Sequence, residues 1–165
     1  MQNKETKKTV SAPKQKSFIP YALIAATLTA IVVIGGWVLF SSYTNVRTVT
    51  AQIGGQPFSL EVADTNAARA QGLSERDSLA NNAGMLFVFD SLGDWRMHMI
   101  QMRFAIDIAW LDENKTIVHI KHNATPAEYP EVYKSDVPAK YVIEVPTGTF
   151  SSLDVQEGDS ISFSL

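Results

Sequence analysis

The sequence predicts a small, mainly β domain, an antiparallel barrel or sandwich with short helices, preceded by one membrane-spanning helix. Short β-favouring segments separated by turn residues run through residues 46–165, and no long helical segment links one to the next. Residues 18–40 carry no charge. Once this stretch and the tail before it are set aside, the 165-residue chain has room for one domain.

The N-terminal part reads as a basic tail followed by an anchor. Residues 1–17 hold five lysines and one glutamate, a net charge of +4. The uncharged run after them would span roughly 34 Å as a helix, enough for a hydrocarbon core of roughly 30 Å. Because positive charge favours the cytoplasmic side, we expect a cytoplasmic N-terminus, a transmembrane signal anchor at 18–43 in the lipid bilayer, and an extracytoplasmic domain at 46–165.

A cleaved signal peptide is the alternative to the anchor. It requires a shorter apolar core and a small-x-small cleavage site, and residues 41–45 provide a poor site. The short lysine tail and the anchor suit a bacterial cell membrane. Comparing the mature N-terminus on purified membranes distinguishes the two forms.

Composition excludes several classes of function. The net charge of −3 leaves −7 on everything from residue 18 onward. An acidic domain without a basic helix repels phosphate backbones, so we expect no nucleic-acid partner. The absence of cysteine excludes disulfides, a thiol nucleophile and Cys-ligated metal sites.

The domain begins with a predicted hairpin and a short helix. Residues 47–53 and 58–62 are β-favouring and flank Gly54 and Gly55, which can take the positive φ angles of a tight turn. Asp64 or Thr65 can cap a helix over residues 66–71.

Five further strands are predicted downstream. Residues 85–89 form a continuous apolar run, typical of a buried strand. The period-two pattern of residues 106–110 and the strand-like residues 116–121 suggest a second hairpin. Strands at 141–145 and 160–163 follow, with a single-turn helix near 151–155 between them.

Several of these segments resemble the domain of unknown function 192 (DUF192) family. The matching residues include Arg69, Gly72-Leu73, Arg76 and the run 84–89, then Met99, Met102 and the segments 106–108 and 141–145. The resemblance covers residues 62–163 and implies a compact, closed β-barrel of complex topology, in a family that is often exported or anchored. It implies no assigned activity. His98, Ile100, Gln101 and Ala105 depart from the family pattern, so roles of the usual residues at those positions do not carry over.

Four charged residues are candidates for a polar pocket: Arg69, Arg76, Asp107 and Glu144. Asp107 lies between two isoleucines, and a buried carboxylate there needs donors, for which Arg69 or Arg76 are the expected partners. A cluster of Asp107, Arg76 and Glu144 is either the floor of a pocket or a buried ion pair that fixes strand register.

A second set of candidates is Met97, His98, Met99 and Met102. Thioether and imidazole groups suit Cu(I), whereas methionine is also a common filler of irregular cores. No cofactor is expected on the leading interpretation.

Three functional hypotheses follow from the sequence. The leading one is a membrane-tethered binding or accessory module of the cell envelope, acting on an unknown small ligand or with a membrane-protein partner. The alternatives are a copper-binding module and an envelope-acting hydrolase that uses Asp107, Glu144 or a histidine. No hydrolase elbow or phosphate-binding loop is present.

Overall fold

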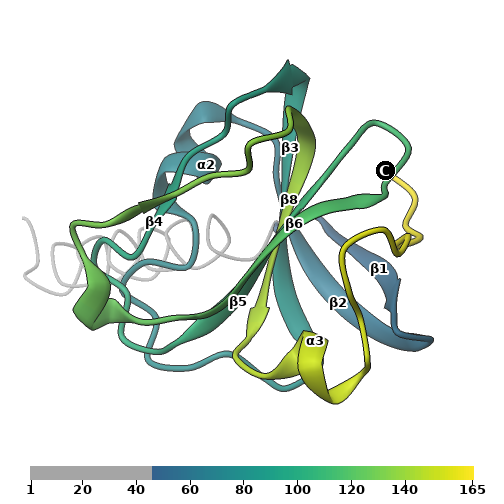
Figure 1. Cartoon of the computed structure of the whole chain (residues 1–165). Helices are drawn as coiled ribbons and strands as arrows, with labels where there is room; N and C mark the ends of the chain where they lie inside the picture. The colour runs from purple at the N-terminus through teal and green to yellow at the C-terminus, as the bar shows by residue number, and fades with distance from the viewer. Residues whose placement is uncertain (1–45) are drawn as a thin grey trace, which may run out of the picture. The chain divides into compact units, whose positions relative to one another are not determined.

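The computed structural model describes residues 46–165, which are built around one curved, six-stranded sheet (Figure 1). Its strand order is β1-β2-β3-β8-β5-β6. The predicted tail at 1–17 and anchor at 18–43 lie outside the described residues. Within residues 46–165, no helix combines the length and the apolar character needed to span a bilayer.

The opening hairpin is confirmed. Strands β1 (Thr48–Ile53) and β2 (Gln56–Ala63) pair antiparallel through a two-residue turn at Gly54 and Gly55. Both glycines have positive φ, +55° and +78°, which is the geometry that favours glycine in such hairpins.

Helix α2 (Asn66–Gln71) is also confirmed, with Thr65 as its N-cap. The Ala68 amide donates to the Thr65 hydroxyl at 3.1 Å, and Gly72 ends the helix with a φ of +51°. The helix belongs to the connection through residues 64–82. This connection is long enough to return the chain so that β3 (Ala83–Gly93) pairs parallel with β2.

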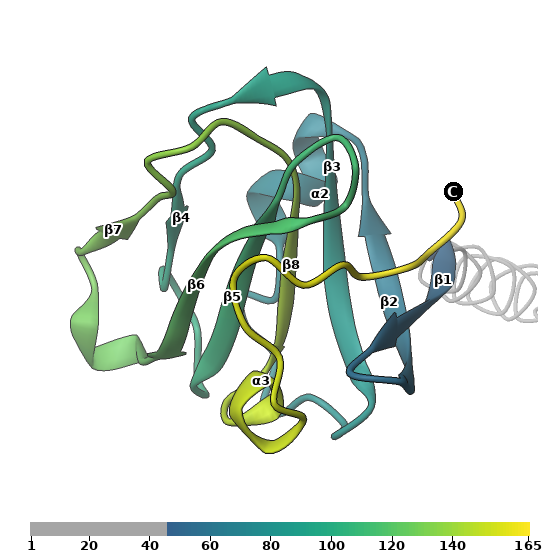
Figure 2. The same ribbon diagram turned by 45° about the vertical axis from the view of Figure 1, so that its right-hand side comes forward.

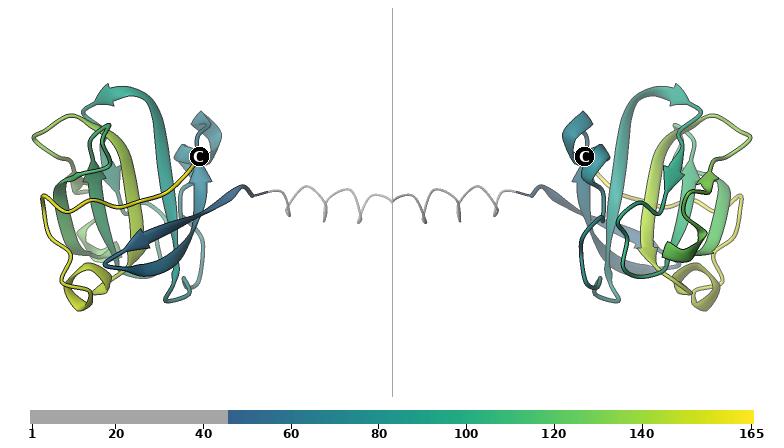
Figure 3. Two further views of the ribbon diagram at one scale, coloured as in Figure 1. Left: turned by 90° about the vertical axis from the view of Figure 1, so that its right-hand side faces the viewer. Right: turned by 90° about the vertical axis from the view of Figure 1, so that its left-hand side faces the viewer.

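The prediction of a wholly antiparallel arrangement is therefore wrong at one pair of strands. The remaining pairs in the main sheet are antiparallel: β8 (Ala139–Pro146) lies between β3 and β5 (Ile106–Leu111), and β6 (Ile117–Ala124) pairs with β5. Figure 3 shows the β1–β2 hairpin and α2 together at one end of the sheet, away from β5 and β6.

A closed barrel is not formed, because the edge strands β1 and β6 do not pair with each other. The C-terminal segment crosses toward β1 instead (Figure 2). There the Gln52 amide donates to the Ser162 carbonyl at 2.8 Å, and the Ile117 amide at the start of β6 donates to the Asp159 carbonyl at 2.8 Å. Residues 160–163, predicted as a strand, make only isolated bridges, so an irregular segment occupies the gap.

Four short elements complete the domain. Strands β4 (Met97–His98) and β7 (Val132–Tyr133) form a separate two-stranded sheet that the sequence pattern does not predict. A 3-10 helix, η1 (Pro126–Glu128), precedes β7. The single-turn helix α3 occupies Thr149–Ser152, slightly earlier than predicted.

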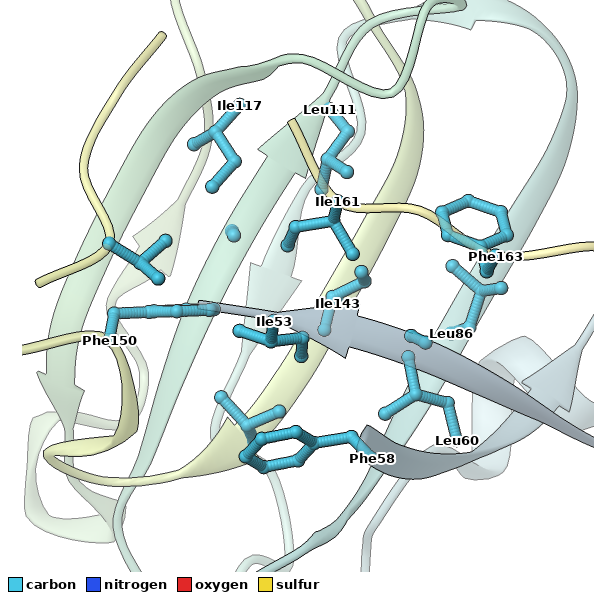
Figure 4. Packing of buried hydrophobic residues seen from close by; sticks show 14 of the residues in the cluster. Ile53, Phe58, Leu60, Leu86, Leu111, Ile117, Ile143, Phe150, Ile161 and Phe163 are labelled. Carbon is cyan, nitrogen blue, oxygen red and sulfur yellow. The ribbon is translucent and has the colours of Figure 1, made fainter. Parts of the chain in front are cut away.

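The sheet buries apolar side chains on both faces, which explains why every residue of β5 is buried. We call the two groups the Phe150 cluster and the Trp110 cluster. The Phe150 cluster fills the curve of the sheet beneath the C-terminal segment (Figure 4) and includes Ile53, Leu60, Leu86, Ile143, Phe150, Ile161 and Phe163. The Trp110 cluster lies on the other face and includes Leu73, Met85, Phe87, Phe89, Met97, Met99, Ile108, Trp110 and Val142.

Candidate functional site

Glu144 is a buried carboxyl in the middle of the main sheet. It lies on β8 between its register partners Met85 on β3 and Ile108 on β5. Side chains paired in register point to the same face, so Glu144 faces the Trp110 cluster. Only 4% of the residue is exposed, and none of the hydrogen bonds or ion pairs among residues 46–165 reaches its carboxyl oxygens.

Burial changes the protonation of this group. Desolvation raises the pKa of Glu144 to about 8, and the nearby charge of Arg76 offsets part of that increase. At neutral pH the carboxyl is therefore mainly protonated and neutral. A neutral carboxyl can donate one hydrogen bond and accept others.

A cavity of about 110 Å³ opens next to Glu144. Its walls come from α2 and the turn after it, from β3, and from β4 with its neighbours. The lining side chains include the charged or titratable Arg69, Arg96, His98 and Glu144, the polar Gln71 and Ser74, and the apolar Leu73, Phe87, Phe89, Met97 and Met102. An apolar cavity with a few convergent polar groups is the usual form of a ligand site.

Arg69 lies in the last turn of α2, and hydrogen bonds hold its side chain at one wall of this cavity. Its Nη1 donates to the carbonyl oxygens of Asp64 at 2.8 Å and Val88 at 2.7 Å, and its Nη2 donates to the side-chain oxygen of Asn66 at 2.6 Å. The guanidinium also lies 5.3 Å from the centre of the Phe89 ring. These contacts hold its position without using a carboxylate.

Arg76 is near Glu144 but is paired with a different residue. Its guanidinium makes a bidentate ion pair with Glu61 on β2, with two distances of 2.6 Å. Glu61 and Glu144 are the register partners of Met85 on either side, so their Cα atoms lie about two strand spacings, roughly 10 Å, apart across the sheet. Arg76 thus acts on Glu144 through its electric field.

Asp107 lies on the opposite face of the sheet from Glu144. It is the register partner of Val145, and its carboxylate accepts hydrogen bonds from the backbone amides of Asn123 at 2.9 Å and Phe150 at 3.3 Å. Among residues 46–165, His122 is the one basic side chain within ion-pair distance of this carboxylate, with Nδ1 at 4.0 Å. The expected pairing with Arg69 or Arg76 is wrong, and the structure does not bring Asp107 into one cluster with Arg76 and Glu144.

The backbone contacts give Asp107 a structural role. Asn123 has a φ of +50° next to a register shift between β5 and β6, and Phe150 is in the first turn of α3. The carboxylate therefore ties an irregular part of β6 to the start of a helix. This fits the interpretation of a group that fixes strand register, with main-chain donors in place of an arginine.

Three of the four predicted copper ligands line the Glu144 cavity: Met97, His98 and Met102. Met99 is buried in the Trp110 cluster and does not line the cavity. The backbone amide of Ile100 donates to Nδ1 of His98 at 3.5 Å. Among residues 46–165, no group of three or more His, Asp or Glu side chains is arranged to hold a metal ion.

A wider hollow of about 530 Å³ lies elsewhere on the domain, between the β1–β2 turn and α3. Its lining consists of uncharged residues such as Asn82, Thr147 and Leu153. It contains no titratable side chain, so we take the smaller Glu144 cavity as the candidate site.

Comparison with known proteins places this domain in a family. The family model of DUF192, described as "Uncharacterized ACR", matches residues 49–163. The chain belongs to the DUF192 family. The match covers almost all of the described domain, including Glu144 and every residue that lines its cavity.

Two archaeal relatives in the DUF192 family carry the name UPF0127 protein. The one from Thermococcus gammatolerans is 35% identical over 106 residues, which is 63% of this chain and 65% of that protein. The one from Thermococcus kodakarensis, TK1120, is 32% identical over 108 residues, which is 63% of this chain and 64% of that protein. The matched part thus spans slightly less than two thirds of either relative.

A solved structure shares the fold of this DUF192 domain. It is a protein of Sinorhizobium meliloti 1021, described as a candidate transcription regulator, with a TM-score of 0.68 and 28% identity. The similarity covers 72% of this chain and 95% of that one.

The sequence pattern did not point to Arg96, Phe87 or Phe89 as site residues. The two phenylalanines read as core positions in an apolar run, and Arg96 reads as an ordinary exposed arginine. Only the placement of β4 against α2 and β3 brings them to one cavity, and β4 is too short to predict from its residues.

Proposed function

We propose that residues 46–165 are a ligand-binding module of the cell envelope and that the Glu144 cavity is its binding site. The observation that carries this proposal is a carboxyl that is 4% exposed, lines a cavity and has no protein partner within the described residues. The Glu144 oxygens are not among the fully buried side-chain atoms without a partner in residues 46–165, so they keep access to the cavity. A ligand in the cavity can therefore supply the hydrogen-bond partner that the protein does not.

A thermal-shift screen tests this function. Residues 46–165 form one compact unit with its own core, so this segment can be screened against small acids, amines, amides and sugars. A ligand at 100 times its Kd stabilises a protein by about 2.7 kcal/mol. We expect the screen to find a ligand that stabilises the wild type. This stabilisation should disappear in Glu144→Leu, which replaces the carboxyl group of the cavity with an apolar side chain.

The matched control for this screen is Glu113→Gln. Glu113 is an exposed carboxylate in the turn between β5 and β6, away from the cavity lining. It should leave the ligand effect unchanged. If the best ligands act equally on the wild type and Glu144→Leu, the assignment of the site is wrong.

We further propose that this module is held outside the cytoplasm by an anchor at residues 18–43. The support is the uncharged run at 18–40, long enough to cross a bilayer, and the five lysines before it. Protease added to intact spheroplasts should digest the domain, and the same protease added to inverted vesicles should leave it protected. The reverse pattern contradicts the proposed orientation.

Copper binding is a second candidate function, because Met97, His98 and Met102 line the same cavity. The two arginines that also line it oppose a cation. A competition titration with a Cu(I) chelator, on the wild type and on Met102→Leu, distinguishes the two functions. Submicromolar Cu(I) binding that Met102→Leu weakens would favour copper over an organic ligand.

The geometry does not support a hydrolase that uses two carboxyl groups at one site. A hydrolase that used Asp107 and Glu144 together would need both carboxyl groups at one site, and they lie on opposite faces of the sheet. A hydrolytic role for either carboxyl alone has no further support among the described residues.

A further inference from the structure

The Glu144 cavity is small, and its size limits what can enter. Its volume of about 110 Å³ compares with the roughly 10–15 Å³ of cavity volume that one water molecule needs. Pockets for drug-sized ligands are about 300–1,000 Å³. The cavity therefore has room for a group of a few non-hydrogen atoms, either a small molecule or the end of a longer one.

The side chains around the cavity carry more positive than negative charge. Arg69 and Arg96 both line it, and Glu144 is the one carboxyl in the lining. The guanidinium of Arg69 donates to two backbone carbonyl oxygens and to the Asn66 amide oxygen, all of them neutral. Arg96 is exposed and makes no ion pair with another residue of the segment 46–165. Both positive charges remain available to a ligand.

The other neighbours of Glu144 leave this balance unchanged. Its register partners on β3 and β5 are uncharged. Arg76 faces it from the chain that follows α2, but this guanidinium is paired with Glu61 of β2. His98 from β4 adds positive charge only when it is protonated.

From this geometry we propose that the cavity binds a small aliphatic carboxylate, free or as the end group of a short chain. The Glu144 carboxyl donates its O–H to one oxygen of the ligand, and Arg69 and Arg96 stabilise the negative charge. Phe87 and Phe89 contact the alkyl part. This inference rests on the proposed function and names the class of ligand for the same site.

The charge of Glu144 gives this binding a defined pH dependence. The pKa of Glu144 is about 8 because the group is buried. Above that pH the carboxyl loses its proton, so it no longer donates and it repels a bound anion. One unit above the pKa only about a tenth of the sites stay protonated, so affinity should fall about tenfold.

Calorimetric titration of the purified full-length chain with propionate tests the proposal, with propionamide and propylamine as uncharged and cationic probes. We expect propionate to bind at pH 6.5 and to bind about tenfold more weakly at pH 9. At pH 6.5, propionamide and propylamine should each bind at least tenfold more weakly than propionate. Alanyl-alanine with a free or an amidated C-terminus tests whether the cavity also accepts the end of a chain. If it does, the dipeptide with the free carboxylate should bind and the amidated one should not; if neither binds, the ligand is a free small acid.

Three variants connect the binding to its residues. Arg96→Gln removes an exposed charge without breaking an ion pair and should weaken propionate at least threefold, whereas Lys115→Gln, a charge removal beside Phe163 in the other cluster, should not. Glu144→Gln keeps a hydrogen-bond donor that does not titrate, so its affinity should be equal at pH 6.5 and pH 9. Glu144→Leu should abolish binding.

The outcomes test the class of ligand and the location of the site as two separate hypotheses. Preferential binding of propylamine, or equal binding of propionate and propionamide, overturns the carboxylate inference; if Glu144→Leu abolishes that binding, the cavity remains a ligand site. Propionate binding that is unchanged in Arg96→Gln and Glu144→Leu overturns the inference as well. If none of the probes binds, the carboxylate inference is wrong. The wider thermal-shift screen then decides the proposed function.

Discussion

Asp107 and Glu144 are both buried carboxyl groups on adjacent strands of one sheet, yet their surroundings differ. Asp107 accepts hydrogen bonds from two backbone amides and lies among the residues that shape β6 and α3. Glu144 receives no hydrogen bond from the described residues and lines a cavity. Burial alone therefore does not distinguish a carboxylate with a structural role from the carboxyl of the proposed site. In this sheet the two groups differ in whether main-chain amides donate hydrogen bonds to them.

The largest expected effect is the pH dependence of stability that Glu144 creates. Its pKa is raised to about 8 in the folded protein, against about 4.3 in an unfolded chain. Between these values the folded state holds a proton that the unfolded state has lost, so stability is full below about pH 4.3 and falls as pH rises toward 8. Between pH 5 and pH 8 this loss is as much as about 4 kcal/mol.

Urea unfolding of the wild type and Glu144→Gln at pH 5 and pH 8 measures this loss. The difference between the two proteins isolates Glu144 from all other titrating groups, and Glu113→Gln serves as the control on an exposed carboxylate. Glu144→Gln should be the more stable protein at pH 8. Parallel pH profiles for the two proteins would show that Glu144 is solvated or partnered in solution.

The next largest effect is expected at Asp107. In Asp107→Ala the amides of Asn123 and Phe150 lose their acceptor, and one unsatisfied buried donor costs about 1–3 kcal/mol. We expect a loss of about 3 kcal/mol in the free energy of unfolding, measured by urea titration. Asp107→Asn keeps one acceptor oxygen and should lose less, while any ligand of the Glu144 cavity should bind to it unchanged.

The exposed Asp136 provides the control for this pair of variants. It makes no hydrogen bond or ion pair through its side chain with the rest of residues 46–165, so Asp136→Ala should change stability by less than about 0.5 kcal/mol. If Asp107→Asn lost ligand binding while remaining folded, Asp107 would join Glu144 as a functional group.

Gly84 tests the backbone beside Glu144. A Cβ at this position would overlap with the Glu144 carbonyl oxygen and lie 2.7 Å from Cδ2 of Leu60, so β3 and β8 approach closely only because residue 84 has no side chain. Gly84→Ala should separate the two strands and cost about 2 kcal/mol in thermal or urea unfolding. Unchanged stability would mean that β3 accommodates the methyl group without moving.

The sequence predicts the local elements of this domain better than its long-range arrangement. Turn glycines and a capping threonine act through neighbouring residues, so the hairpin at Gly54-Gly55 and helix α2 are predicted correctly. The parallel pairing of β2 with β3 depends on contacts distant in the chain. The open sheet follows from an irregular C-terminal segment between β1 and β6, whose residues look like a strand.

The candidate site was predicted in part for the same reason. Arg69 is predicted as a donor to Asp107, and Glu144 as a member of the same polar cluster; both line the cavity. Asp107 belongs to the predicted cluster too, but the face to which it points depends on the β5–β8 register. A single sequence without partner strands does not reveal that register, so the sequence groups two carboxyl groups that lie on opposite faces of the sheet.

The smallest expected effect concerns Arg76, which connects the two kinds of role. Its ion pair with Glu61 is partly exposed, with 33% and 26% of the side chains accessible, so it contributes about 1 kcal/mol or less to stability. Its charge also lowers the pKa of Glu144. Replacing it in Arg76→Met should therefore raise the pH at which Glu144 ionises, although the two side chains do not form an ion pair.

Carbon-detected NMR titration of the Glu144 carboxyl measures this shift. The double variant Arg76→Met with Glu61→Met separates the shift from the effect of leaving Glu61 unpaired. An unchanged titration midpoint in both variants would show that desolvation alone sets the protonation of Glu144.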